Sequence, residues 1–225
     1  MPLIPEKDQE QLRKLFADRL ESPVRLDFYT REAPTPGAPG NACLSCDETH
    51  QLLEELVALS EKLELNVHDV SIPEQTAPET GIEELPVIVL SGKNKGTLRF
   101  IGAPAGYEAS TLIEDLVNAS RGTTGLQFHS REVLAGLTAP VHIKVFVTPT
   151  CPYCPKAAGL AHMMAVESEM VTADVIEVSE FPHLSERYQV YGVPKTVINE
   201  TAQFEGARPE AAVIGAVEAA AAGTI

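Results

Sequence analysis

The sequence predicts an α/β protein made of two copies of one structural unit. Two Cys-x-x-Cys motifs, Cys43–Cys46 and Cys151–Cys154, contain all four cysteines of the 225-residue chain. Each motif begins 43 positions before a proline in an apolar stretch, Pro86 in the first half and Pro194 in the second. Helical and extended patterns follow the same order in both halves. The repeated spacing therefore indicates that one fold occurs twice, with a dithiol at the head of a helix in each copy.

The first half alternates helical and extended patterns. Apolar residues recur at helical spacing from Leu12 to Leu20, and residues 23–29 are typical of a short strand. After the first dithiol, a helix is expected whose inner face carries Leu52, Leu56, Leu59 and Leu63. The remaining expected elements are a strand at 65–70, a hairpin of strands at 87–90 and 98–101 around the turn 92–96, and a closing helix from Tyr107 to Ala119.

The second half repeats this order. Its expected elements are a helix around 132–137, strands at 141–147, 174–178 and 196–199, a helix carrying Leu160, Met163 and Met164, and an Ala-rich helix from about Pro209. A strand, a helix and a strand, followed by a hairpin and a helix, form a mixed sheet flanked by helices. We expect an N-terminal domain at 1–122 and a C-terminal domain at 123–225, with residues 121–125 as the joint.

The composition restricts the classes of function. Two domains of about 100 residues each can bury cores without disulfide staples. The formal net charge of −15, with no Lys/Arg cluster, argues against nucleic acid or an anionic membrane as a partner. No basic segment followed by an apolar run opens the chain, and no stretch reaches the roughly 20 apolar residues of a membrane span. We therefore expect a cytoplasmic protein, in which paired cysteines are more often catalytic or metal-binding than structural.

The dithiols suit thiol–disulfide exchange. The attacking species is a thiolate, which needs a lowered pKa and exposure. At a helix N-terminus, free N–H groups and the positive end of the dipole stabilise a negative sulfur. The second cysteine of each motif would lie one turn into the helix and be less exposed. We predict four catalytic residues, of which Cys151 and Cys43 attack and Cys154 and Cys46 resolve.

The two dithiols differ in their sequence surroundings. Pro152 restricts the turn of the second motif, whereas Leu44 and Ser45 leave the first one looser. A Pro/Gly-rich insertion at 33–41 precedes Cys43 and excludes a regular helix or strand there. We expect this insertion to be a surface loop. The two sites should differ in reduction potential, and the second should contribute most of any reductase activity.

The two prolines have two readings. A proline at the start of a strand can be tolerated because its missing N–H falls where no ladder bond is needed. The matched separation from each dithiol instead favours a cis peptide bond beside the sulfurs, between Leu85 and Pro86 and between Val193 and Pro194.

Other readings of the dithiols stay open. The first cysteines of the two pairs lie 108 positions apart, compared with about 15–20 between the pairs of a zinc ribbon. Help from His50 at Cys43–Cys46 would still leave one zinc ligand missing, so we expect no metal. Purely structural disulfides would close loops too short to stabilise the fold strongly.

Several motifs are similar to those of known families. Cys151–Cys154 after the strand at 144–147 resembles the glutaredoxin active site, and 192–194 resembles the cis-proline strand of the thioredoxin superfamily. The tandem arrangement over almost the whole chain, together with 102–106, resembles the protein disulfide oxidoreductase family. This resemblance implies two tandem thioredoxin-like folds, each with a mixed central sheet flanked by helices. Asp27 is similar to the buried acid of thioredoxins, although an ordinary, partly exposed aspartate is the reading we prefer.

The resemblance also implies a function. It indicates a protein-disulfide reductase, with isomerase activity as an extension, that acts on protein substrates through redox-active disulfides and without a bound cofactor. The substrate-binding residues would be Pro194, Val193, Pro86 and Leu85, since the residue before each cis-proline offers backbone hydrogen bonds to a peptide. Electrons would come from NADPH through a thioredoxin-reductase-like flavoprotein.

Two alternative functions stay open. The protein could be a dedicated electron donor to a peroxidase. It could instead be a non-catalytic binding or chaperone module whose dithiols are incidental or bind zinc. This second alternative predicts full function after Cys→Ser substitution.

Overall fold

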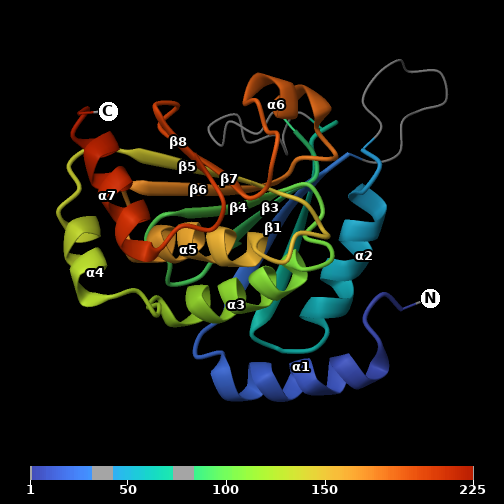
Figure 1. Cartoon of the computed structure of the whole chain (residues 1–225). Helices are drawn as coiled ribbons and strands as arrows, with labels where there is room; N and C mark the ends of the chain where they lie inside the picture. Colours follow the sequence, from blue (N-terminus) through green and yellow to red (C-terminus); the bar gives the residue numbers. More distant parts are fainter. Residues whose placement is uncertain (1, 32–42, 73–83, 225) are drawn as a thin grey trace.

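The computed structural model describes residues 2–31, 43–72 and 84–224 (Figure 1). The predicted loop at 33–41 lies outside the described residues. The first half contains α1 (Glu6–Arg19), β1 (Val24–Thr30), α2 (Cys46–Val57), β2 (Leu63–Asp69), β3 (Val87–Ser91), β4 (Thr97–Ile101) and α3 (Glu108–Arg121). The second half contains α4 (Phe128–Ala135), β5 (Val141–Val147), α5 (Cys154–Glu167), β6 (Val171–Glu177), α6 (Pro182–Arg187), β7 (Lys195–Ile198), β8 (Ala202–Glu205) and α7 (Glu210–Ala221).

The repeat is visible in the order of the strands. The sheet runs β2-β1-β3-β4-β6-β5-β7-β8, so each half uses the same order of its own four strands. In each half the first two strands are parallel and the last two form an antiparallel hairpin. β4 pairs in parallel with β6, which joins the halves into one eight-stranded sheet. The mixed α/β fold is confirmed, whereas the division at residues 122 and 123 stays a prediction.

Helices cover the two faces of the sheet unequally. Helices α2, α3, α5 and α7 contribute to one large apolar core, and in Figure 1 α3, α5 and α7 lie on the same side of the sheet. On the opposite side, α6 covers a small cluster centred on Phe146 and Phe181. Successive side chains of a strand point to opposite faces, which is why Val145 enters the large core and Phe146 the small one.

Several element boundaries differ from the prediction. The helix expected to extend to Leu63 ends at Val57, and Leu63 instead begins β2. Leu59 and Leu63 are still buried, so apolar spacing continues past the helix end and does not reveal it. α6 and β8 were not among the elements predicted, because segments of six and four residues are too short to show a period. Among the described residues, no helix is long and apolar enough to cross a bilayer.

Candidate active site

Both dithiols lie at the same end of the sheet. β1 pairs antiparallel with β3, and β3 pairs antiparallel with β4, so β4 is parallel to β1. β4 is parallel to β6, and β6 is parallel to β5. β1 and β5 therefore run in the same direction. Each of these two strands leads into a dithiol. β3 and β7 run the opposite way and therefore begin at this end, directly after Pro86 and Pro194. The topology thus brings all the predicted site residues to one end of the molecule.

The second dithiol, Cys151–Cys154, is a disulfide at the head of α5. The Cα atoms are 5.4 Å apart. Cys151 retains 8% of its accessible surface, whereas Cys154 is fully buried within the first turn of the helix. The order of exposure is the one expected for an attacking Cys151 and a resolving Cys154, although these roles stay a prediction.

The first dithiol, Cys43–Cys46, has the same arrangement at the head of α2. Its sulfurs are 2.05 Å apart and its Cα atoms 5.4 Å apart. Cys43 is half-buried and Cys46 is 2% exposed. His50, the possible zinc ligand, stacks on Phe28 with ring centroids 5.7 Å apart. In the part of the chain that the structure describes, no three His, Cys, Asp or Glu side chains gather as metal ligands would.

The electrostatic surroundings of the two dithiols differ. The first turn of α2 carries Asp47 and Glu48, whereas the first turn of α5 carries no acid. A negative charge near a cysteine disfavours its thiolate form. The head of α2 therefore carries more negative charge than the head of α5. This contrast supports the predicted inequality of the two sites and gives it a physical cause in addition to the stiffness of the turn.

Both prolines are preceded by cis peptide bonds, Leu85–Pro86 and Val193–Pro194, as the sequence predicted. The carbonyl oxygen of Pro86 accepts a hydrogen bond from the N–H of Gly102 at 2.9 Å. That of Pro194 accepts one from Gly206 at 2.8 Å. Leu85 and Val193, the predicted peptide-binding residues, are both half-buried. Their role in binding substrate stays a prediction.

A loop of the first half packs against the approach to the second dithiol. The N–H of Tyr107 donates to the carbonyl oxygen of Pro149 at 3.0 Å. Gly106 has a φ of +61°, and a Cβ there would lie 2.1 Å from that same oxygen. A side chain at position 106 would therefore displace the segment that leads to Cys151. No local signal in the sequence pairs these two segments.

Three exposed tyrosines belong to segments around the second dithiol, two from the second half and one from the first. Tyr153 lies within the second dithiol turn, Tyr191 precedes the cis-proline, and Tyr107 adjoins Pro149. Their exposed fractions are 70%, 89% and 53%. Large exposed aromatic rings are common at surfaces that bind other proteins. Neither Tyr107 nor Tyr153 is singled out by the sequence patterns.

Asp27 is an ion-pairing residue of the sheet. Its carboxylate accepts hydrogen bonds from Arg25 at 2.8 Å and contacts His68 Nε2 at 3.1 Å. Burial alone would raise the pKa of Asp27, but the hydrogen bonds from His68 and Arg25 hold it below its ordinary value. Its neighbours Leu26 and Phe28 enter the large core that α2 helps to form, so Asp27 points to the opposite face. Asp27 is only 8% exposed, so it is more buried than the preferred reading expected, but its contacts with Arg25 and His68 are those of an ordinary ion-pairing residue.

Glu108 is a buried acid that the sequence analysis missed. It begins α3, is 1% exposed, and accepts a hydrogen bond from the Thr111 hydroxyl at 2.9 Å. Within the described residues, its other oxygen, Oε1, has no hydrogen-bond partner. Burial raises the pKa of Glu108 to about 7. Helical spacing places position 108 on the inner face of the helix, but spacing cannot show how a polar residue there is satisfied.

Comparison with known proteins identifies the family. Residues 141–218 match the family described as "Thioredoxin domain". The thioredoxin of Methanocaldococcus jannaschii is 34% identical over 79 residues, which are 35% of this chain and 93% of that protein. This chain belongs to the thioredoxin family. The crystal structure of a protein disulfide oxidoreductase from Aeropyrum pernix superimposes with a TM-score of 0.86 at 28% identity, covering 98% of this chain and 94% of that one.

An alkyl hydroperoxide reductase protein of Staphylococcus epidermidis is a further relative. It is 26% identical over 159 residues, and the match covers 70% of this chain but only 29% of that relative's length. A domain of an alkylhydroperoxide reductase from Enterococcus faecalis shares the fold, with a TM-score of 0.81 at 23% identity, covering 95% of this chain and 99% of that one. The predicted resemblance to protein disulfide oxidoreductases is confirmed. The chain has the thioredoxin fold and two C-x-x-C sites, each of which is a disulfide in this structure.

Proposed function

We propose that this protein is a thiol–disulfide oxidoreductase that reduces disulfide bonds in other proteins, and that Cys151 forms the first covalent bond to the substrate. The observation that carries the proposal is the geometry of the second dithiol. Cys151, the more exposed of the two cysteines, directly precedes α5, whose first turn contains no acidic residue. Cys154, the resolving cysteine, is fully buried in that first turn. This arrangement favours a thiolate at the attacking position and protects the second thiol from outside reagents.

The reaction consists of two exchanges. The Cys151 thiolate attacks one sulfur of the substrate disulfide, forms a mixed disulfide, and releases the other substrate sulfur as a thiolate that takes up a proton. Cys154 then loses its proton and attacks the Cys151 sulfur. The mixed disulfide breaks, the second substrate sulfur leaves as a thiolate and is protonated, and Cys151–Cys154 becomes a disulfide. The substrate gains two electrons and two protons in total.

The substrate would contact the residues around this sulfur. The backbone of Val193, before the cis-proline, would pair with an extended polypeptide, and that of Leu85 would do so at the first site. The exposed rings of Tyr153 and Tyr191 offer apolar surface beside it. A protein substrate fits these contacts better than a small thiol, because small thiols have neither a strand to pair nor side chains to bury.

The electron source is proposed to be NADPH, delivered through a thioredoxin-reductase-like flavoprotein. The similarity to an alkyl hydroperoxide reductase protein supports a partner of this kind and also favours a second candidate function. In that candidate, the dithiols donate electrons chiefly to a peroxidase.

A coupled assay tests the electron source and separates the two candidates. With NADPH and a purified thioredoxin reductase, the protein is expected to support NADPH oxidation when insulin is added, and Cys151→Ser/Cys154→Ser to abolish it. Replacing insulin by a peroxiredoxin and hydrogen peroxide measures the second candidate. Turnover with the peroxiredoxin alone would favour the dedicated donor. If the protein reduces insulin with dithiothreitol but not with NADPH and the thioredoxin reductase, the proposed electron source is wrong.

A further inference from the structure

We propose that Glu180 is a positioning residue for the first dithiol, through a contact that the second half makes with the first. Its carboxylate holds the Ser45 hydroxyl away from the sulfurs and thereby keeps the Cys43–Cys46 pair more reducing than it would otherwise be. The inference rests on the thiol–disulfide activity of this site but not on the proposed substrates or electron source.

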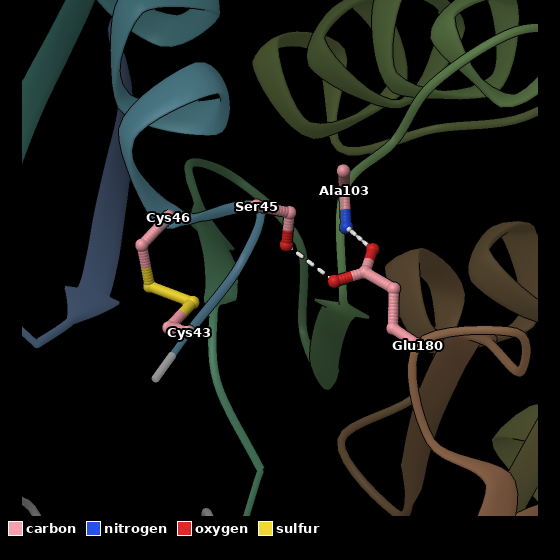
Figure 2. The surroundings of a disulfide bond; sticks show 5 residues. All are labelled: Cys43, Ser45, Cys46, Ala103 and Glu180. Atoms are coloured by element: carbon pink, nitrogen blue, oxygen red, sulfur yellow. Dashed lines mark hydrogen bonds between the residues drawn. A yellow bond between two sulfur atoms is a disulfide. The ribbon is translucent and has the colours of Figure 1, made fainter. Parts of the chain in front are cut away.

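The contact lies beside the turn of the first dithiol (Figure 2). The Ser45 hydroxyl donates a hydrogen bond to Glu180 Oε2. The other oxygen, Oε1, accepts the N–H of Ala103 at 2.7 Å. Figure 2 shows the Ser45 side chain pointing toward Glu180, with the disulfide on the other side of the turn. One carboxylate thus connects the dithiol turn, the loop after β4 and the loop after β6.

Glu180 is held in place by its surroundings. Its N–H donates to the backbone oxygen of Glu177 at 3.2 Å and to Glu177 Oε2 at 3.1 Å. Gly102 leaves the space that the carboxylate occupies, since a Cβ there would lie 2.8 Å from Glu180 Oε1 and 2.9 Å from the Glu177 Cβ. Gly102 also has a φ of +89°, which favours glycine. The carboxylate therefore fits a prepared place and is not a long side chain that meets Ser45 by chance.

The contact disfavours a thiolate at Cys43 in two ways. A serine hydroxyl has one proton to donate, so the hydroxyl bound to Glu180 cannot stabilise a neighbouring sulfur anion. The carboxylate also adds negative charge near a helix N-terminus that already carries Asp47 and Glu48. The position equivalent to Ser45 in the second dithiol is Tyr153, whose exposed side chain is 70% accessible. The second dithiol therefore has no serine at this position for a carboxylate to hold, and the proposed effect concerns the first dithiol.

A less stable thiolate makes a dithiol a stronger reductant. Stabilising the reduced form raises a reduction potential, and destabilising it lowers that potential. Glu180 should therefore bias Cys43–Cys46 toward the disulfide. A more reducing first dithiol favours transfer of electrons from it to the second dithiol, which assigns the first site the role of relay.

The test uses the full chain in a Cys151→Ser/Cys154→Ser background, so that only the first dithiol reacts. The equilibrium of Cys43–Cys46 with a glutathione redox buffer is measured, together with the pH at which iodoacetamide alkylates Cys43 at half its maximal rate. Glu180→Ala should shift the equilibrium toward the dithiol by three- to tenfold, or about 15–30 mV. It should also move alkylation to lower pH. Glu180→Gln, which removes the charge but keeps the shape, should shift both quantities in the same direction.

Two further variants separate positioning from general loss of structure. Glu186→Gln removes a carboxylate from an exposed position of α6 and should change neither quantity. In Glu180→Ala, adding Ser45→Ala should reverse part of the shift, because the released hydroxyl is then absent. Unchanged equilibrium and alkylation in both Glu180 variants, or a shift toward the disulfide, would overturn the proposal. Because no substrate protein is present, neither result bears on the proposed function.

Discussion

Insulin reduction driven by dithiothreitol is expected to fall by at least about tenfold in Cys151→Ser/Cys154→Ser and to stay near wild type in Cys43→Ser/Cys46→Ser. The second dithiol has an acid-free helix N-terminus and Pro152 in its turn. The first has Asp47 and Glu48 in its helical turn, which reduce the thiolate available for attack.

The two double variants make the same kind of change, because each replaces the two cysteines of one disulfide at the head of a helix. The rate of insulin precipitation, followed by turbidity, measures the difference. The opposite ranking would contradict the division of labour, while the assignment as an oxidoreductase would stand.

Replacing Glu108 by Gln is expected to stabilise the protein above neutral pH and to have little effect near pH 4.5. Burial raises the pKa of Glu108 to about 7, from an ordinary value of 4.5. Between these two values the folded protein keeps a proton that the unfolded chain releases. The free energy of unfolding therefore decreases as the pH rises through this window.

Glutamine does not titrate, so the unfolding free energy of the Glu108→Gln variant does not decrease with pH for this reason. The difference in unfolding free energy between Glu108→Gln and wild type should grow by roughly 3 kcal/mol at most between pH 4.5 and pH 8. Urea denaturation at the two pH values measures it. Glu169→Gln, at an exposed position, is the matched control and should show no such growth. A difference for Glu108→Gln that is the same at both pH values would refute the buried titration.

The parts of the fold that follow from local patterns could be predicted from the sequence. The equal spacing of Cys43 to Pro86 and Cys151 to Pro194 indicated the repeat, the position of each dithiol and the cis peptide bonds, because one short motif marks each of them. The hairpin and the helices that close each half followed from apolar spacing and turn residues. These features depend on residues that are close in sequence or repeated.

Features that depend on contacts between the halves could not be predicted. Nothing in the strand patterns of β4 and β6 shows that they pair and join two sheets into one. The bond between Ser45 and Glu180 spans 135 positions, and Glu108 is buried near His162 of α5. Neither acid belongs to a motif that would reveal its contacts. Acidic residues are common on the surface, so only the tertiary structure distinguishes these two.

Cys151 is proposed to form the covalent bond to substrate proteins, and Cys154 to release them. The most direct measurement is a trap in a Cys43→Ser/Cys46→Ser background, in which immobilised Cys154→Ser and Cys151→Ser variants are exposed to a cell lysate. Bound proteins are then analysed by non-reducing gels and mass spectrometry. We expect mixed disulfides through Cys151 in the Cys154→Ser variant, released by dithiothreitol, and few or none in Cys151→Ser. Equal capture by Cys151→Ser, through Cys154, would contradict it.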